Sequence, residues 1–333
     1  MRKSIQAIFA LFLMFSSDSE ASYVYYPYCE SGFFFDAGVE GIYVEEPDIG
    51  FYGLVTPDDT PAVIYDPSCL TARVSGSVGY TFFPTGMCRC FGENVQFFVT
   101  SSFFTCSQRG KKDLTDLGPV QLFAINGGGV GNALEVSQVN NFHSCHWENH
   151  TDAMISGISD LCYGFSLHTA VGFGFIYRCQ QFKSNLFNES ISYNNGTITE
   201  NLDTYYRGVK VEFGISKRFC DCWLVTMVPT FGIYDACTNL CAHQDWGQLA
   251  DGINGLDPVS QSEKLSLTAY QGAFRSSFLR DWCGYYVGGQ VFVEYLSYVP
   301  GLFNPREDDD GPTRIVEKNS FRYGGGFVIG KIF

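Results

Sequence analysis

The last residues of the chain alternate between large apolar side chains and small or polar ones. Residues 321–333 read FRYGGGFVIGKIF, with aromatic or aliphatic residues at most odd positions and glycine or arginine at most even positions. This period of two predicts a strand with one apolar face and one small or polar face. An ordinary edge strand of a soluble sheet is the alternative interpretation.

The same alternation recurs along the chain in ten segments. Each has about 12 to 16 residues, more than the 9 to 11 that cross a bilayer at a tilt, so we expect the strands to project beyond it. The ten predicted strands are 33–44, 71–83, 92–105, 146–158, 164–178, 204–219, 224–236, 263–278, 285–298 and 320–333.

Short and long connections alternate between these segments. The short ones are 84–91, 159–163, 220–223 and 279–284, and the long ones are 45–70, 106–145, 179–203, 237–262 and 299–319. We therefore predict an all-β fold, a transmembrane antiparallel β-barrel with short periplasmic turns and long extracellular loops. Residues 120–125 are a further strand or a segment folded into the pore, so the predicted range is 10 to 14 strands.

Both ends of the chain fit export to a membrane. Arg2 and Lys3 precede a short apolar run, and small residues follow at Ser19 and Ala21. This pattern predicts a signal peptide over residues 1–21 and a single barrel domain over 22–333. The terminal aromatic residue, Phe333, is interpreted as the insertion signal that outer-membrane barrels carry, although Lys331 stands where such strands usually have an apolar residue.

The composition favours a membrane over a nucleic-acid partner. Charged residues make up 17% of the chain, against about 25% in an average soluble domain. Aromatic residues also make up 17%, and the net charge is −14, which argues against nucleic acid. The acidic run 307–310 suits a divalent cation, but a solvated loop is the favoured interpretation.

The alternation also predicts which charged side chains face the lumen. Such side chains set the selectivity of water-filled pores. Five basic and four acidic residues give a mixed lumen with no assigned ion preference. The predicted pore-lining residues are Asp36, Glu40, Arg73, Lys210, Glu212, Arg218, Arg275, Glu294 and Arg322.

Thirteen cysteines in an exported chain predict oxidised pairs. Seven fall before the first strand or at the short turns, and an odd number cannot all pair within one chain. We hypothesise that adjacent barrels are cross-linked by disulfides. The candidates are Cys29, Cys88, Cys90, Cys162, Cys220, Cys222 and Cys283. The other six are expected at outer strand ends or in the long loops, where Cys106, Cys179 and Cys237 each close a strand.

Metal binding and catalysis have weaker support. His143, Cys145, His146 and His150 are expected in one loop, but no cysteine or histidine spacing matches a common structural zinc pattern. His168 is expected on the lumen side of its strand, and His243 in a loop near Asp245, with no partners that specify a catalytic triad. No GxSxG, HExxH or phosphate-loop motif is present in the sequence. We therefore predict no metal, no cofactor and no enzymatic activity.

Several segments resemble a known family. Residues 206–234, 172–182, 288–302 and the closing GGGFVIGKIF are similar to the pore-forming major outer membrane protein family of Legionella, also found in chlamydia-related bacteria. The resemblance covers roughly the second half of the mature chain. It implies a cysteine-rich porin that forms oligomers and is disulfide-linked in the envelope.

The sequence thus predicts an outer-membrane porin for passive diffusion of small hydrophilic solutes. Its expected partners are outer-membrane lipid, the barrel insertion machinery and further copies of itself. The alternative is a structural or adhesive barrel with a closed lumen, since barrels of eight strands are filled by side chains and open channels are familiar at sixteen. A soluble secreted β protein is the third interpretation.

Overall fold

The computed structural model describes residues 32–51, 63–82, 94–113, 120–122, 125, 134–136, 138–187, 195–219, 222–245, 258–282, 285–304 and 311–332. The predicted signal peptide and Phe333 lie outside the described residues. No helix in the described part of the chain is long and apolar enough to cross a bilayer.

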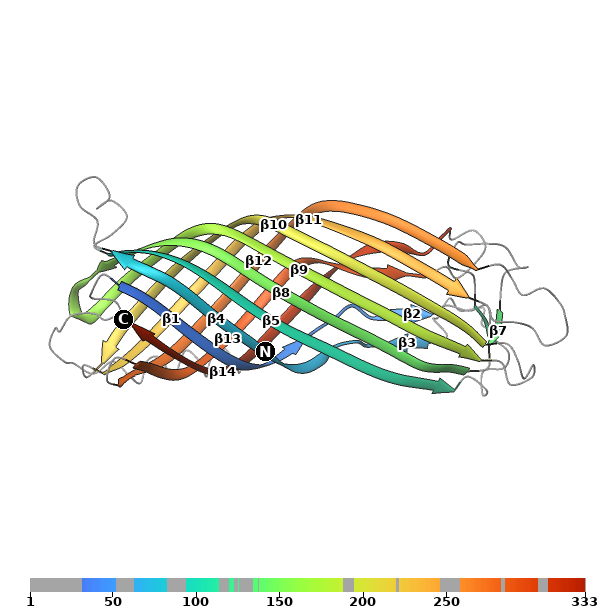
Figure 1. Ribbon diagram of the computed structural model, residues 1–333, viewed down its shortest axis with the longest axis horizontal. Helices are drawn as coiled ribbons and strands as arrows, with labels where there is room; N and C mark the ends of the chain where they lie inside the picture. The colour runs from blue at the N-terminus through green and yellow to red at the C-terminus, as the bar shows by residue number, and fades with distance from the viewer. Residues whose placement is uncertain are drawn as a thin grey trace.

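Ten antiparallel strands close into one barrel (Figure 1). Their order around the barrel is β1, β14, β13, β12, β11, β10, β9, β8, β5 and β4. The strands are β1 (Gly32–Val44), β4 (Cys69–Phe82), β5 (Asn94–Asp113), β8 (Gln138–Asp160), β9 (Phe165–Phe187), β10 (Asn195–Phe219), β11 (Trp223–Asp245), β12 (Val259–Trp282), β13 (Tyr285–Phe303) and β14 (Arg314–Ile332). The predicted fold class is therefore confirmed.

The barrel is closed by β1, which pairs with β4 on one side and with β14 on the other. Phe34 lies opposite both Gly79 and Ile332, so the start of β1 and the end of β14 lie at the same end of the barrel. We call this the turn end, because the short connections lie there, and the opposite end the loop end. One short turn is the 3₁₀ segment Cys162–Gly164, where Tyr163 and Gly164 both have positive φ.

The strands are longer than the sequence pattern predicted, and the additional residues lie at the loop end. β9 reaches Phe187 instead of 178, β10 begins at Asn195 instead of 204, and β11 reaches Asp245 instead of 236. The predicted long loops are correspondingly shorter. Alternation in hydropathy marks a strand only where one face is apolar, and in these extensions the outward face is polar.

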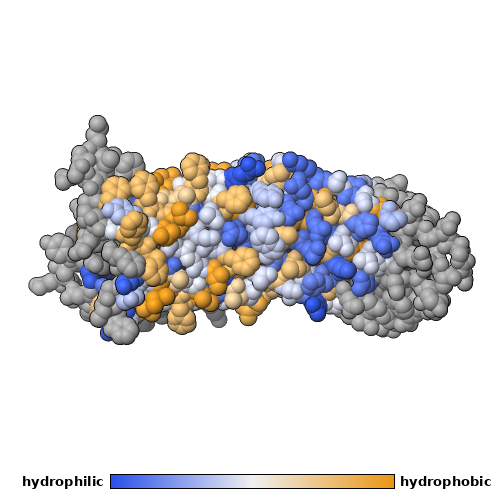
Figure 2. All heavy atoms as spheres, viewed as in Figure 1, coloured by the Kyte–Doolittle hydropathy of each residue, from blue (hydrophilic) through white to orange (hydrophobic). Residues whose placement is uncertain are grey.

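The outer wall divides into an apolar half and a polar half. Hydrophobic residues gather over the half nearer the turn end, and hydrophilic residues cover the half nearer the loop end (Figure 2). Exposed apolar side chains such as Phe173, Val209, Phe231 and Phe327 form the first half, which we call the apolar band.

Aromatic girdles flank the apolar band on both sides. The turn-end girdle contains Phe33, Tyr80, Phe82, Phe97, Phe165, Phe219, Trp223, Phe278 and Tyr285. The loop-end girdle contains Tyr43, Phe103, Trp147, Tyr177, Tyr205 and Tyr323. An apolar band between aromatic girdles is the outer surface of a transmembrane β-barrel.

Two small hairpins lie outside the barrel sheet. β2 (Ile49–Phe51) pairs with β3 (Val63–Tyr65), and β6 (Val120–Leu122) pairs with β7 (Leu134–Val136). The segment 120–125 thus contributes a three-residue hairpin strand rather than an eleventh barrel strand. Beyond it, buried Ile125 donates its backbone N–H to Gln244 Oε1 at 2.8 Å and accepts a hydrogen bond from the Thr313 N–H at 2.7 Å.

Candidate functional site

A polar cavity of about 260 Å³ lies inside the part of the barrel that carries the apolar band. Six of the nine predicted pore-lining residues line it: Asp36, Arg73, Lys210, Glu212, Arg275 and Glu294. Arg218 lies in a small neighbouring pocket with Tyr286 at the turn end. The remaining two, Glu40 and Arg322, face the interior and are fully buried.

Charged groups in the cavity are partly paired with each other. Lys210 Nζ lies 2.6 Å from Asp152 Oδ2 and 3.3 Å from Glu212 Oε1. Asp36 accepts hydrogen bonds from the hydroxyl groups of Ser77 and Tyr286. These contacts leave the cavity polar and accessible to water, while fixing most of its charges to the wall.

The cavity ends at a layer of ion pairs that crosses the lumen. We call this the ion layer, and its members are Glu40, Glu46, Arg73, His146, Glu148, His150, Arg178, Glu294 and Arg322. It lies at the height of the loop-end girdle, since Glu148, Arg178 and Arg322 are the sequence neighbours of Trp147, Tyr177 and Tyr323.

The central contact of the ion layer spans the barrel. Arg322 on β14 binds Glu148 on β8 through both guanidinium nitrogens, at 2.5 Å and 2.8 Å. β5, β4 and β1 lie between these two strands in the sheet, so the pair crosses the lumen instead of following the wall. Arg178 Nη1 reaches the same carboxylate at 3.1 Å, and Glu294 lies 3.4 Å from Arg322.

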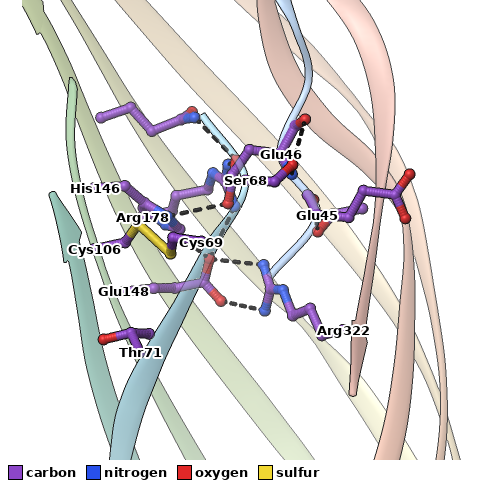
Figure 3. A network of polar contacts seen from close by, with 12 residues as sticks. Glu45, Glu46, Ser68, Cys69, Thr71, Cys106, His146, Glu148, Arg178 and Arg322 are labelled. Atoms are coloured by element: carbon purple, nitrogen blue, oxygen red, sulfur yellow. Dashed lines mark hydrogen bonds and ion pairs between the residues drawn. A yellow bond between two sulfur atoms is a disulfide. The ribbon is translucent and has the colours of Figure 1, made fainter. Parts of the chain in front are cut away.

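Glu46 enters the ion layer from a segment that leaves the wall after β1. Its carboxylate contacts Arg178 (Figure 3). Gln180 Nε2 also donates to this carboxylate at 3.3 Å. The backbone N–H of Glu46 donates to Ser68 Oγ at 3.0 Å. Ser68 precedes Cys69, the first residue of β4, whose disulfide to Cys106 fastens the start of β4 to β5 beyond their paired residues.

Most of the ion layer is shielded from water. Glu40, Glu148, Arg178 and Arg322 are each 0% exposed, so a charge left without its partner there is strongly unfavourable. Burial by itself raises the pKa of Glu46, but Arg178 and His146 oppose it and hold this pKa at about 2.

The charges of the ion layer nearly cancel. Four carboxylates meet three guanidinium groups, and two imidazoles lie among them. Both ring nitrogens of His146 face carboxylates, Nδ1 toward Glu46 at 3.0 Å and Nε2 toward Glu148 at 3.4 Å.

Toward the loop end the interior is packed with side chains. Ile176, Tyr206, Tyr234, Leu296 and Tyr298 belong to one buried apolar cluster. The Tyr206 hydroxyl donates to the Tyr298 carbonyl at 3.2 Å, which ties β10 to β13.

Further out in the same packed interior, Glu200 is buried, and its Oε1 has no hydrogen-bond partner among the described residues. Burial raises the pKa of Glu200 to about 8. Glu200 is therefore mostly protonated at neutral pH.

Sequence analysis did not single out several members of this site. They are Glu46 and Glu200 in predicted loops, Arg178 at the end of a predicted strand, and Glu148 and Asp152 within one. Glu148 and Asp152 lie within the predicted strand 146–158, where extending the inward parity would have found them. Glu46 gave no such signal, because it lies on no barrel strand.

The cysteines also differ from expectation. The disulfide joins Cys69 and Cys106, which were not among the seven pairing candidates. Cys222 carries a free thiol, and the side chains of the other six candidates lie outside the described residues. Cys106, Cys179 and Cys237 do not close their strands, because β5, β9 and β11 continue past them.

The expected histidine cluster is divided between the two faces of β8. His146 and His150 face the lumen, whereas His143 faces outward and contacts Ser107 Oγ at 3.0 Å. His168 is buried inside the barrel, and His243 lies on the outer wall of β11, 3.0 Å from Ser260 Oγ. Among the residues that the structure covers, no group of three or more His, Cys, Asp or Glu side chains is arranged to hold a metal ion.

Comparison with known proteins bears on this architecture alone. No protein-family model and no curated protein matches the chain. The outer membrane protease OmpT from Escherichia coli is similar in structure, with 8% identity, 95% of this chain and 100% of that chain covered, and a TM-score of 0.45. The CymD monoaromatic hydrocarbon channel gives 8% identity, 91% and 89% coverage, and a TM-score of 0.33. At these values the comparisons carry no argument about activity, substrate or residue roles.

Proposed function

We propose that this chain is a bacterial outer-membrane channel for small hydrophilic solutes, and that the ion layer holds its lumen closed at rest. The observation that carries the proposal is the polar cavity inside the apolar band, which ends at ion pairs that cross the lumen. Side-chain contacts of this kind separate by rotamer changes, so the barrel wall need not change when the lumen opens.

The membrane assignment is supported by the apolar band and its girdles. In this placement the turn end faces the periplasm and the loop end faces the exterior. A signal peptide over residues 1–21 and an insertion signal at Phe333 complete the export route. We also propose that the chain belongs to the Legionella-type major outer membrane protein family and forms homo-oligomers.

Catalysis has no part in this proposal. His168 is one of the residues that line the cavity, whereas His243 lies on the outer face of β11, away from it. Diffusion needs no cofactor. Solute passage requires that the ion layer opens and that the packed side chains on its loop-end side move aside.

A structural or adhesive barrel is the second candidate, and the burial of the ion layer favours it. Removing one partner of a buried ion pair costs about 3 to 5 kcal/mol. If several pairs must separate together, open states are rare and the barrel serves as a closed scaffold for its loops.

Single-channel conductance in a planar bilayer separates the two candidates. The wild-type chain is compared with the double variant Glu148→Gln/Arg322→Met, which removes the central pair without changing the net charge. We expect rare openings for the wild type and frequent or continuous openings for the variant. A silent variant that still migrates as a folded, heat-modifiable barrel would support the structural barrel, and loss of heat-modifiable migration in the wild type would support the soluble interpretation.

A further inference from the structure

The turn-end girdle carries positively charged residues seated on its aromatic rings. Lys217 Nζ lies 4.8 Å from the ring centre of Phe165 and 5.0 Å from that of Phe219. Arg280 Cζ lies 5.3 Å from the centre of the Trp223 ring. All of these side chains face outward, at the edge of the apolar band.

A third cation continues this row on the last strand. Lys331 Nζ lies 4.8 Å from the centre of the Tyr285 ring. Lys217, Arg280 and Lys331 therefore stand on β10, β12 and β14, on alternate strands of the sheet. Neighbouring strands are about 4.8 Å apart, so successive cations are separated by roughly 10 Å along the girdle.

The sign of this row is opposite to that of the whole protein. The chain has a net charge of −14. Nevertheless, the described residues that face outward in the turn-end girdle include no carboxylate, because nearby Asp36 and Asp281 line interior cavities. The loop-end half of the outer wall, by contrast, exposes acidic residues such as Asp235 and Asp245. Positive charge is thus concentrated at one of the two membrane interfaces.

We propose that these three cations and their aromatic rings form a binding surface for anionic phospholipid headgroups. The aromatic rings lie at the depth of the headgroup region, and the long basic side chains extend from the apolar wall toward the phosphates. Phospholipid is the occupant that the placement favours, because the turn end faces the periplasmic leaflet. This inference rests on the membrane placement proposed above.

The surface also explains Lys331. A lysine near the end of the last strand breaks the apolar alternation. In the structure its ammonium group lies at the interface over Tyr285, where a charge is solvated by headgroups instead of hydrocarbon. The residue that departs from the strand pattern is therefore one of the three that bind lipid.

Tryptophan fluorescence tests the surface directly. The chain has four tryptophans, and two single-tryptophan variants retain either Trp223 in the turn-end girdle or Trp147 in the loop-end girdle. The full chain is refolded into vesicles of phosphatidylcholine and phosphatidylglycerol, with one of the two lipids brominated. Quenching then gives the relative affinity of the two lipids near each tryptophan.

We expect phosphatidylglycerol to be preferred near Trp223 by on the order of fivefold or more, since each Lys or Arg near an anionic surface contributes about that factor. Near Trp147 the ratio should be close to one. The triple variant Lys217→Gln/Arg280→Gln/Lys331→Gln should lose the preference at Trp223. The matched control Arg109→Gln/Lys183→Gln/Lys264→Gln removes three charges from the outer wall beyond the apolar band and should retain it.

Two outcomes overturn the proposal: equal ratios at both tryptophans, or a preference that survives the triple variant. Failure of the membrane placement gives a different signal, because neither tryptophan is then quenched by any brominated lipid. Vesicles containing brominated phosphatidylserine distinguish charge from headgroup identity. The same preference for this lipid supports recognition of charge, whereas its absence overturns recognition by charge alone.

Discussion

Replacing Arg322 by methionine removes the residue that joins the two sides of the ion layer. Arg322 binds Glu148 through both guanidinium nitrogens and contacts Glu294 at 3.4 Å, and all three side chains are at most 6% exposed. The variant leaves Glu148 with Arg178 and two histidines, and leaves Glu294 with Arg73 at 3.8 Å.

The expected loss follows from leaving buried carboxylates without a bidentate partner. Breaking a buried pair in this way costs about 3 to 5 kcal/mol. With a urea dependence of about 2 kcal/mol/M, the unfolding midpoint should fall by about 1.5 to 2.5 M. Heat-modifiable migration and tryptophan fluorescence, both followed against urea for the chain refolded in vesicles, measure this midpoint.

Two further variants make the result interpretable. Arg314→Met on the same strand removes an exposed guanidinium that lies over Phe303. Its free energy of unfolding should therefore change by no more than about 0.5 kcal/mol, which shifts the urea midpoint by at most about 0.25 M. Adding Glu148→Gln to Arg322→Met should recover part of the loss, because one uncompensated carboxylate is then removed. An Arg322→Met midpoint equal to that of Arg314→Met would refute the view that the ion layer is a tightly coupled closure of the lumen.

Three other predictions concern separate parts of the barrel. Glu200→Gln should stabilise the barrel at pH 8 by on the order of 4 kcal/mol. In the unfolded wild type Glu200 ionises above about pH 4.5, whereas the folded barrel keeps this carboxyl protonated up to about pH 8, so between these pH values ionisation favours the unfolded chain. Urea midpoints measured at pH 8 and at pH 4.5 test this, and the gain should vanish near pH 4.5. Replacing Cys69 and Cys106 together by alanine should lower stability by up to about 4 kcal/mol, and reductant should shift the wild-type midpoint equally. Gly326→Ala should reduce the folded yield, since its Cβ would lie 2.0 Å from a carbonyl oxygen of β1, whereas Gly272→Ala, with open space around it, should fold normally.

The strands were predictable because the apolar band imposes a strict period of two on the chain. In β9, Phe173 and Phe175 face lipid while Gly172 and Gly174 do not, and this contrast is readable without a structure. Beyond Tyr177 the outward residues are Cys179, Gln181 and Lys183, so the contrast in hydropathy disappears although the strand continues. The missed strand ends are therefore the part of the barrel outside the hydrocarbon.

The sequence predicted which side chains face the lumen, but not which of them pair with each other. Facing direction follows from parity, which placed Glu40 and Arg322 on the inside. Pairing across the lumen depends on the barrel's diameter and stagger, which single segments do not encode, so the contact between Glu148 and Arg322 could not be derived. The position of Glu46 could not be predicted either. It depends on the path of the chain after β1 and on the hydrogen bond from its backbone N–H to Ser68, which lies beside the disulfide.

The strand extensions set how far the surface loops stand from the membrane. β9 runs on from Tyr177 in the loop-end girdle to Phe187, about ten residues, which at about 3.3 Å per residue and a tilt of about 40° is a rise of roughly 25 Å. An antibody, phage or host protein that binds the loops thus meets them well clear of the lipid headgroups. The residues that follow the strand extensions are thus separated along the chain from the part of the barrel that lies in the membrane.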